Sequence, residues 1–220
     1  MQDPLSSLPL VHGIDVSKAQ DIVSWPVVKS AGYAFAYVKA TDGETYVDPT
    51  FEQNWTGAAA AGLLRGAYHF FRAEDSPQAQ AEFFWQTVGG NGDLPLVIDV
   101  EESMSQSNST VISNLTQLLD LLQQLSGRRP MIYTDPGFWN GLGAGNFGDY
   151  PLWVADYPSS GVYTPTLPAG WTGWDFWQYY GGPPSGSTDY VQVPGISTPV
   201  DLDVFNGPAD ALAQWVRMGT

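Results

Sequence analysis

Short apolar segments and helix-forming segments alternate five times along the first 142 residues of this 220-residue chain. The helix-forming segments have ordinary boundary residues, with proline in the first turn or glycine after the last turn. The strand-like runs cover residues 12–16, 33–41, 64–71, 94–101 and 131–134. The first helix-like run begins near residue 25 and stops at Gly32, and the others cover about residues 48–61, 76–88, 110–126 and 136–142. This order predicts βα units with parallel strands, because each helix returns the chain across the sheet.

The last third of the chain departs from this alternation. Strand-like runs at residues 151–157, 173–180 and 200–205 are joined by loops rich in glycine and proline, and a helix is expected only at 208–217. Eight short apolar strands are enough to close a barrel. Because no linker divides the chain, we predict an α/β fold with one irregular, TIM-barrel-like β/α barrel over residues 11–220. Residues 1–10 are expected to form a flexible leader.

Composition excludes several classes of function. Eight Lys and Arg against 23 Asp and Glu give a net charge of −15, which disfavours nucleic acid and anionic membranes as partners. Without cysteine there is no disulfide or thiolate metal site. No apolar stretch is long enough to span a membrane, and the N-terminus lacks the pattern of a signal peptide. The nine tryptophans suit a large core, and their ring faces also suit sugar rings.

Acidic residues stand near the ends of three predicted strands. Asp15 ends the first strand, Asp99 and Glu101 end the fourth, and Asp201 and Asp203 lie in the last. The functional face of a β/α barrel is the carboxyl end of its strands, so these acids are expected to meet at one rim. Alternate strand residues share a face, which places Asp99 and Glu101 side by side. Further polar and aromatic candidates near strand ends are Tyr68, Tyr133, Trp153 and Gln178.

Such a group of acids supports more than one chemistry. Glycoside hydrolysis needs one protonated carboxyl group and one ionised carboxylate, whereas a cluster of carboxylates also suits Mg²⁺ or Ca²⁺. The acids could equally cap loops or accept backbone hydrogen bonds. His12 and His69 have no partner at metal-ligand spacing, and His69 is expected to face away from Tyr68. No nucleophile-elbow or phosphate-loop motif is present.

Eight sequence blocks stand in a characteristic order along the chain: HGIDVSKAQ (12–20), YVKATDGETYVDPTFEQN (37–54), GAYHFFR (66–72), LPLVIDVE (94–101), PMIYT (130–134), LWVADY (152–157), DFWQYY (175–180) and VDLDVFNG (200–207). Together these blocks resemble glycoside hydrolase family 25, the muramidase-type lysozymes of bacteria, phages and fungi. The resemblance implies a flattened barrel with five βα units followed by three more strands. It also implies cleavage of the β-1,4 bond between N-acetylmuramic acid and N-acetylglucosamine in peptidoglycan, without a cofactor or metal.

The resemblance also suggests roles for individual residues. Glu101 matches the general acid, and Asp99 matches the neighbouring carboxylate that orients and stabilises the 2-acetamido group of the substrate as an internal nucleophile. Asp15 and Asp201 match the remaining acids of the site. Asp203 stands where many members have Asn, so we assign it no role and expect an exposed turn position. The groove is expected to be lined by Tyr68, Tyr133, Trp153 and Gln178.

Two other functions stay open at this stage. The chain could be a non-catalytic peptidoglycan-binding module that retains the groove, or a hydrolase that uses the same acids to bind a metal. The resemblance further implies peptidoglycan glycan strands as the partner of a monomer. It also implies a location outside the cell, by secretion or by release on phage lysis. Asp42 replaces a common Glu in the block at 37–54, and we expect this change to alter a loop contact rather than catalysis.

Overall fold

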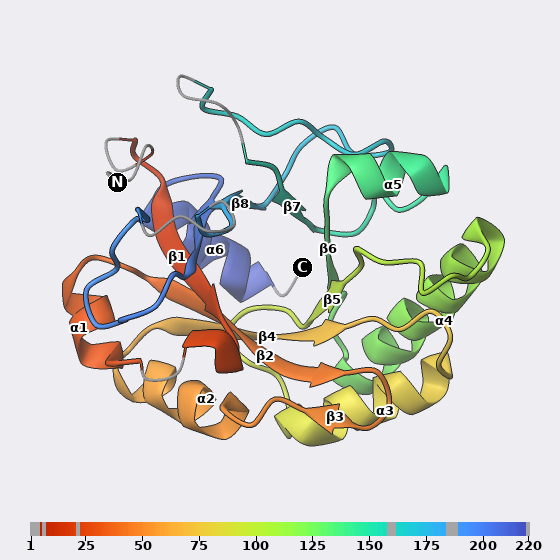
Figure 1. Cartoon of the computed structure of the whole chain (residues 1–220), viewed down its shortest axis with the longest axis horizontal. Helices are drawn as coiled ribbons and strands as arrows, with labels where there is room; N and C mark the ends of the chain where they lie inside the picture. Colours follow the sequence, from red (N-terminus) through yellow and green to blue (C-terminus); the bar gives the residue numbers. More distant parts are fainter. Residues whose placement is uncertain (1–4, 6–7, 21–22, 158–161, 184–188, 219–220) are drawn as a thin grey trace.

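The computed structural model describes residues 5, 8–20, 23–157, 162–183 and 189–218. Eight strands close into a barrel in the order β1-β9-β8-β7-β6-β5-β4-β2, completed by pairing of β1 with β2 (Figure 1). One further strand of two residues, β3 at Tyr46–Val47, pairs with the outer end of β2. The barrel strands are β1 Val11–Val16, β2 Phe35–Asp42, β4 Leu64–Phe70, β5 Val97–Asp99, β6 Met131–Thr134, β7 Leu152–Ala155, β8 Phe176–Tyr180 and β9 Asp201–Phe205.

The predicted barrel is confirmed, and the structure also gives the direction of its last strand, which the sequence did not predict. Neighbouring barrel strands run parallel except β9, which is antiparallel to both β1 and β8. The N-terminal end of β9 therefore lies at the same rim as the C-terminal ends of the other strands. The fourth predicted strand is shorter than expected, because β5 ends at Asp99 and Glu101 follows it in a loop.

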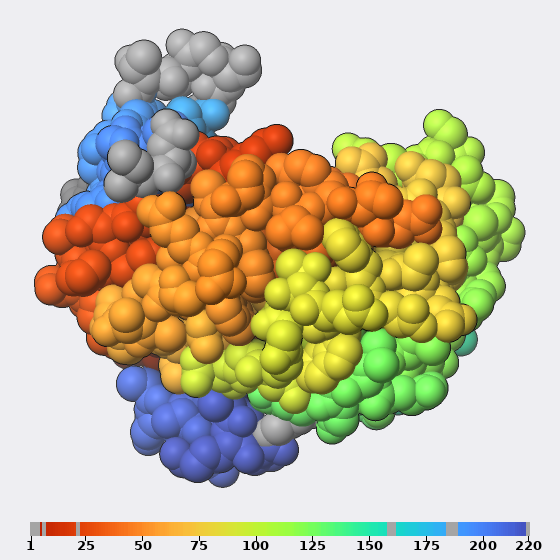
Figure 2. Space-filling model, turned by 90° about the horizontal axis from the view of Figure 1, so that it is seen from below, coloured from red at the N-terminus to blue at the C-terminus, as the bar shows by residue number. Residues whose placement is uncertain are grey.

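Most helices cover one side of the barrel, whereas loops cover much of the other. Figure 1 shows α1 to α4 beneath and beside the early strands, whereas long loops cross the region of β7 and β8. Figure 2, viewed from below, shows the segments from the first half of the chain covering that face. The helices are α1 Trp25–Ser30, α2 Phe51–Ala60, α3 Pro77–Val88, α4 Asn108–Ser126, α5 Pro136–Leu142 and α6 Ala209–Met218, with a short 3-10 turn at Lys18–Gln20.

The helix boundaries follow from local chemistry. The hydroxyl of Ser76 accepts a hydrogen bond from the backbone N–H of Ala79 at the start of α3, and Ser107 caps α4 in the same way. Gly89 and Gly127 end these helices in the left-handed conformation, which glycine adopts without steric cost. Serine caps and C-terminal glycines are readable from sequence, which explains why the predicted start and stop of these helices agree closely with the structure.

Aromatic rings fill the barrel interior below the rim. Tyr37 stacks on Trp153 at 4.7 Å between ring centroids, and Phe35 packs edge-on against Phe176 at 5.1 Å. Gly13 and Gly66 make this packing possible, since a Cβ at either position would collide with the Phe35 or Tyr37 ring. The barrel interior below the rim is thus a packed core.

The C-terminal helix closes the opposite end of the barrel. Trp215 of α6 packs against Phe176 and Phe205, and its indole N–H donates to Asp175 Oδ1 at 3.0 Å. At the N-terminus, residues 1–4 and 6–7 of the predicted leader lie outside the described residues, whereas Leu5 is buried in the core. The flexibility of residues 1–10 stays a prediction.

Candidate active site

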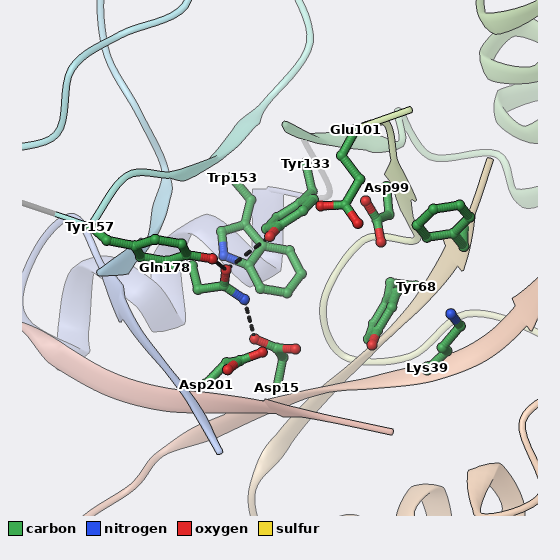
Figure 3. Close-up of a pocket in the computed structure, with 11 residues that line it drawn as sticks. Asp15, Lys39, Tyr68, Asp99, Glu101, Tyr133, Trp153, Tyr157, Gln178 and Asp201 are labelled. Carbon is green, nitrogen blue, oxygen red and sulfur yellow. Dashed lines mark hydrogen bonds between the residues drawn. The ribbon is translucent and has the colours of Figure 1, made fainter. Parts of the chain in front are cut away.

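A cavity of about 260 Å³ opens at the mouth of the barrel. All eight residues proposed from the sequence line it, so strands from both ends of the chain bring their polar side chains together (Figure 3). Lys39, Phe70 and Tyr157 complete the lining, although the sequence analysis did not select them. The full lining is Asp15, Lys39, Tyr68, Phe70, Asp99, Glu101, Tyr133, Trp153, Tyr157, Gln178 and Asp201.

Strand register explains why acids distant in sequence meet. Asp15 pairs with Asp201 across β1 and β9, and Asp99 pairs with Phe70 and Tyr133 on either side of β5. Each of these residues points into the barrel at the rim layer. The antiparallel direction of β9 is essential here, since it brings the first residue of that strand, Asp201, to the rim.

Gln178 is the hydrogen-bonding centre of one side of the cavity. Its side-chain N–H donates to Asp15 Oδ2 at 2.6 Å. Its carbonyl oxygen accepts from the hydroxyls of Tyr133 at 2.8 Å and Tyr157 at 2.6 Å. Figure 3 shows this chain of contacts running from the two tyrosines to Asp15. Asp15 is therefore fixed in position by groups that are themselves fixed.

The opposite side of the cavity holds Asp99 and Glu101 with far fewer contacts. Figure 3 shows their carboxyl groups next to each other. Asp99 is buried, and its Oδ1 has no hydrogen-bond partner within the described part of the chain. Glu101 is exposed at the lip. This pair is free to exchange a proton with a ligand, because few protein groups compete for its oxygens.

Burial is the main cause of the altered acidity of both carboxyl groups. It raises the pKa of Asp99 well above its usual value, and the charge of Glu101 raises it further. Although part of the Glu101 side chain is exposed, the cavity wall withdraws its carboxyl group from water, and this desolvation raises its pKa; Glu102 and Asp135 raise the pKa further, while Lys39 lowers it. The neighbouring carboxyl groups of Asp99 and Glu101 also repel each other. In the structure that repulsion acts chiefly on Asp99, the more deeply buried of the two.

The other two acids are also shifted toward their protonated forms. Burial, followed by the charge of Asp201, raises the pKa of Asp15 well above its usual value, although the Gln178 hydrogen bond lowers it. Burial and the charge of Glu101 raise the pKa of Asp201 to about 6. Carboxyl groups with perturbed pKa values gathered in one cavity are typical of catalytic sites.

Lys39 brings a positive charge to the acidic cavity. Its ammonium group lies 3.4 Å from Asp42 Oδ2 and 4.9 Å from the centre of the Phe70 ring. Asp42 also accepts a hydrogen bond of 2.6 Å from Arg72 Nε. The expected loop contact of Asp42 is therefore an ion pair. Lys39 could have been found from strand alternation, since it follows Tyr37 on the inward face of β2.

The expectation for Asp203 was wrong. Asp203 is 0% exposed within β9, not in an exposed turn, and its Oδ1 accepts a hydrogen bond of 2.9 Å from Trp153 Nε1. Residues two apart on a strand share a face, so Asp203 lies below Asp201 on the inward face. His69 faces outward as expected and hydrogen-bonds Thr41 and Gln80.

Two further hollows adjoin the central cavity. One, of about 410 Å³, shares Glu101, Tyr133 and Tyr157 with it, and another of about 170 Å³ shares Lys39. Together they extend the mouth of the barrel into a groove on both sides of the acids. In the described residues no group of three or more His, Asp or Glu side chains is arranged to hold a metal ion. No described helix is long and apolar enough to cross a membrane.

Residues 14–185 match the family model described as Glycosyl hydrolases family 25. The chain belongs to this family. Lysozyme M1 from Streptomyces globisporus is 40% identical over 217 residues, covering 92% of this chain and 70% of its own. An N,O-diacetylmuramidase from Arthroderma benhamiae is 32% identical over 223 residues, covering 95% of this chain and 88% of its own.

Solved structures agree with this assignment. The bacterial lysozyme from Streptomyces coelicolor superposes with a TM-score of 0.83 at 36% identity, covering 96% of this chain and 98% of its own. A family GH25 lysozyme from Aspergillus fumigatus superposes with a TM-score of 0.78 at 32% identity, covering 96% of this chain and 99% of its own. This family 25 protein is therefore a glycoside hydrolase of the muramidase class, as the sequence blocks indicated.

Proposed function

We propose that this family 25 hydrolase cleaves the β-1,4 bond between N-acetylmuramic acid and N-acetylglucosamine in bacterial peptidoglycan, with Glu101 as general acid. The observation that carries the proposal is the pair of carboxyl groups at the end of β5. Glu101 is exposed at the lip with a raised pKa, and buried Asp99 has an oxygen without a partner in the described structure. A general acid must hold a proton near neutral pH and must reach the substrate.

In the proposed first step, the Glu101 carboxyl group gives its proton to the glycosidic oxygen as the bond from that oxygen to C1 breaks. The carbonyl oxygen of the 2-acetamido group on the same sugar bonds to C1 and forms a cyclic oxazolinium ion. Two neighbouring acids do not both ionise readily, so with the proton of the pair on Glu101 it is Asp99 that is the carboxylate. Asp99 accepts the acetamido N–H and balances the positive charge, which a carboxylate in a water-poor site does well. Water then attacks C1 as the bond from C1 to the acetamido oxygen breaks and restores the 2-acetamido group, and the Glu101 carboxylate takes the proton of the water.

The opposite side of the cavity is proposed to hold the substrate still. Gln178 and the two tyrosines bonded to it fix Asp15, which with Asp201 faces the sugar from β1 and β9. Tyr68 and Trp153 add ring surface to the lining, and aromatic rings favour sugar faces. Holding the substrate and the reacting groups in the right geometry lowers the barrier to reaction, and a rigid scaffold does this best.

The groove on both sides of Glu101 supports a polymer as substrate, since a short sugar would not need three adjoining hollows. Lysozymes and muramidases among the relatives make peptidoglycan the proposed polymer. We also propose that residues 11–220 form one catalytic unit that acts as a monomer outside the producing cell, after secretion or phage lysis. A net charge of −15 is consistent with partners other than nucleic acid or membrane.

Mass spectrometry of purified peptidoglycan tests the proposed linkage. Digestion by the wild type should leave muramic acid at the new reducing ends, and Glu101→Gln should release almost none. The neighbouring variant Glu102→Gln is the matched control and should digest normally. Glucosamine reducing ends would overturn the proposed bond, and equal digestion by Glu101→Gln would move the acid to another residue. No cleavage by any variant would favour a peptidoglycan-binding module, and loss of activity in a chelator would favour a metal-dependent hydrolase.

A further inference from the structure

Asp203 is a buried acid for which the proposed reaction has no use. Its side chain enters the barrel from β9, where the residue pairs with Gly13 of β1 and Gln178 of β8. It therefore lies one layer below Asp15 and Asp201, out of contact with solvent. A carboxyl group at such depth is costly unless its oxygens are paired or it is kept neutral.

The two oxygens of Asp203 have unequal surroundings. Oδ1 accepts the indole N–H of Trp153 at 2.9 Å. Oδ2 is buried, and no amide, hydroxyl or cation of the described residues donates a hydrogen bond to it. The group that faces Asp203 at hydrogen-bond range is the carboxyl group of Asp15. Two carboxylates in contact can form a hydrogen bond only when one of them carries a proton.

The surroundings of this pair favour a retained proton. The titratable groups that act on Asp203 are Asp15 on β1 and Asp201 on β9, and Tyr37 on β2 feels its charge. No Lys or Arg is among the main influences on the pKa of Asp203 in the described structure. Burial, then Asp15 and Asp201, raises the pKa of Asp203 well above its usual value, and the pKa of Asp15 is also raised. Two touching acids without a nearby cation do not both ionise at neutral pH.

The hydrogen bonds decide which acid keeps the proton. Asp15 Oδ2 accepts the N–H of Gln178 at 2.6 Å, an arrangement that favours a carboxylate. Asp203 Oδ1 accepts the Trp153 N–H, as the carbonyl oxygen of a neutral acid can, and this leaves Oδ2 to carry the hydrogen. We propose that Asp203 is a neutral acid whose Oδ2–H donates to Asp15, and that it is a positioning residue that keeps Asp15 ionised and fixed at the rim.

This inference links the packed core to the site. The O–H of Asp203 and the N–H of Gln178 reach Asp15 from two directions, so its rotamer and its charge are fixed together. Asp203 touches no substrate in this scheme and acts through Asp15 alone. The inference depends on the proposed function only where a rate is measured, since the proton on Asp203 can be observed in the resting enzyme.

Infrared difference spectra of the wild type minus Asp203→Asn, near neutral pH, test the proton directly. The wild type should show a carbonyl stretch of a protonated, buried carboxylic acid that Asp203→Asn lacks. Asp175→Asn is the matched control, because both oxygens of Asp175 accept N–H groups, from Leu152 at 2.9 Å and Trp215 at 3.0 Å, and neither oxygen is left to carry a hydrogen. Its difference spectrum should contain no such band. A difference spectrum of the wild type minus Asp203→Asn without that band would overturn the inference.

Kinetics of two Asp203 variants test the positioning role. Asn can still donate to Asp15 and accept from Trp153, so Asp203→Asn should keep kcat within a few-fold of the wild type. Asp203→Leu removes the donor and should lower kcat by about 10- to 100-fold, as expected for one hydrogen bond to a charged group, with little change in KM. An Asn variant as slow as the Leu variant would contradict the role. If Asp203→Leu does not fold, the kcat of Asp203→Asn and the infrared band still test the inference.

Discussion

Asp15 on β1 and Asp99 on β5 line the same cavity, yet the protein holds them differently. Asp15 accepts a hydrogen bond from Gln178 and faces a second acid, Asp203, beneath it. Asp99 is equally buried, but its Oδ1 lacks a partner in the described residues, and its neighbour Glu101 is exposed. One side of the site is thus fixed by hydrogen bonds, and the other side is left free for the ligand.

The difference has a physical basis in the architecture. The fixed side belongs to the junction of β8, β9 and β1, where antiparallel pairing places polar side chains opposite one another. The free side stands at the end of a three-residue strand followed by a loop. Proton transfer needs a group that can change its charge and its contacts, whereas orientation needs groups that cannot. We therefore expect substitutions on the free side to cost rate, and substitutions on the fixed side to cost both rate and stability.

Among variants that keep Glu101, the largest effect is expected from Asp99→Asn. Loss of the charge that balances the cationic intermediate should lower kcat on peptidoglycan by about 10²- to 10³-fold, the usual range for a lost electrostatic partner. The free energy of unfolding should not fall, because the change also removes repulsion between Asp99 and its neighbour Glu101. Steady-state kinetics and urea unfolding measure both quantities. Loss of stability with an unchanged rate would reverse the proposed roles of the two sides.

Gln178→Leu should give a smaller loss of rate together with a loss of stability. The change leaves Asp15 and the hydroxyls of Tyr133 and Tyr157 without their partner. We expect unfolding to become easier by about 1–3 kcal/mol, the cost of unsatisfied buried polar groups, and kcat to fall by about 10- to 100-fold. Urea unfolding alongside kinetics would show this double loss. A variant with wild-type stability would mean that the network does not hold this side together.

Stability should fall as pH rises from about 4 to 7. Acids whose pKa is raised on folding bind protons more tightly in the folded state, so their contribution is complete below the unfolded pKa and is lost as pH rises through the folded one. For Asp201 that window runs from 3.8 to about 6. Because Asp201 is partly exposed, we expect a loss of about 1–3 kcal/mol across the window. Thermal unfolding of the wild type and of Asp201→Asn checks this, since the variant should depend less on pH.

The smallest effect is expected from Glu102→Gln. Glu102 raises the pKa of Glu101 by charge repulsion, second only to burial. Removing that charge should move the basic limb of the pH–rate profile to lower pH by a fraction of a unit, with the maximal rate unchanged, because exposed charges act weakly through water. A pH–rate series on a soluble substrate resolves such a shift. Movement of the limb to higher pH would show that the sign of this interaction is wrong.

Much of the fold could be predicted from the chain because its signals are local. Proline, serine and glycine mark the ends of α3 and α5 so clearly that both predicted spans agree with the structure. The direction of β9 could not be predicted, since a short strand with acids at alternate positions has the same pattern in either direction. Only pairing with β1 and β8 determines its direction, and that pairing depends on the closed barrel.

The candidate site likewise has features that the sequence predicts and features that it does not. The acids could be selected from strand ends, whereas the hydrogen bonds of Gln178 join residues that are 21 to 163 positions apart and leave no local pattern. Asp203 was misjudged for a related reason. Its buried environment includes the indole of Trp153, which lies 50 positions away in the chain, and such a contact leaves no local pattern. Strand alternation alone would have placed it on the inward face with Asp201.

The most direct measurement compares Glu101→Gln and Asp99→Asn on two substrates. One is peptidoglycan, and the other is a muramic-acid-containing oligosaccharide with an aryl leaving group that departs without protonation. Glu101→Gln should lose about 10²- to 10⁴-fold on peptidoglycan, as expected for a missing general acid, and far less on the aryl substrate. Asp99→Asn should lose a similar factor in activity on both substrates, because the positive charge of the intermediate must be balanced in either case. Equal losses of Glu101→Gln on the two substrates would contradict its role as the acid.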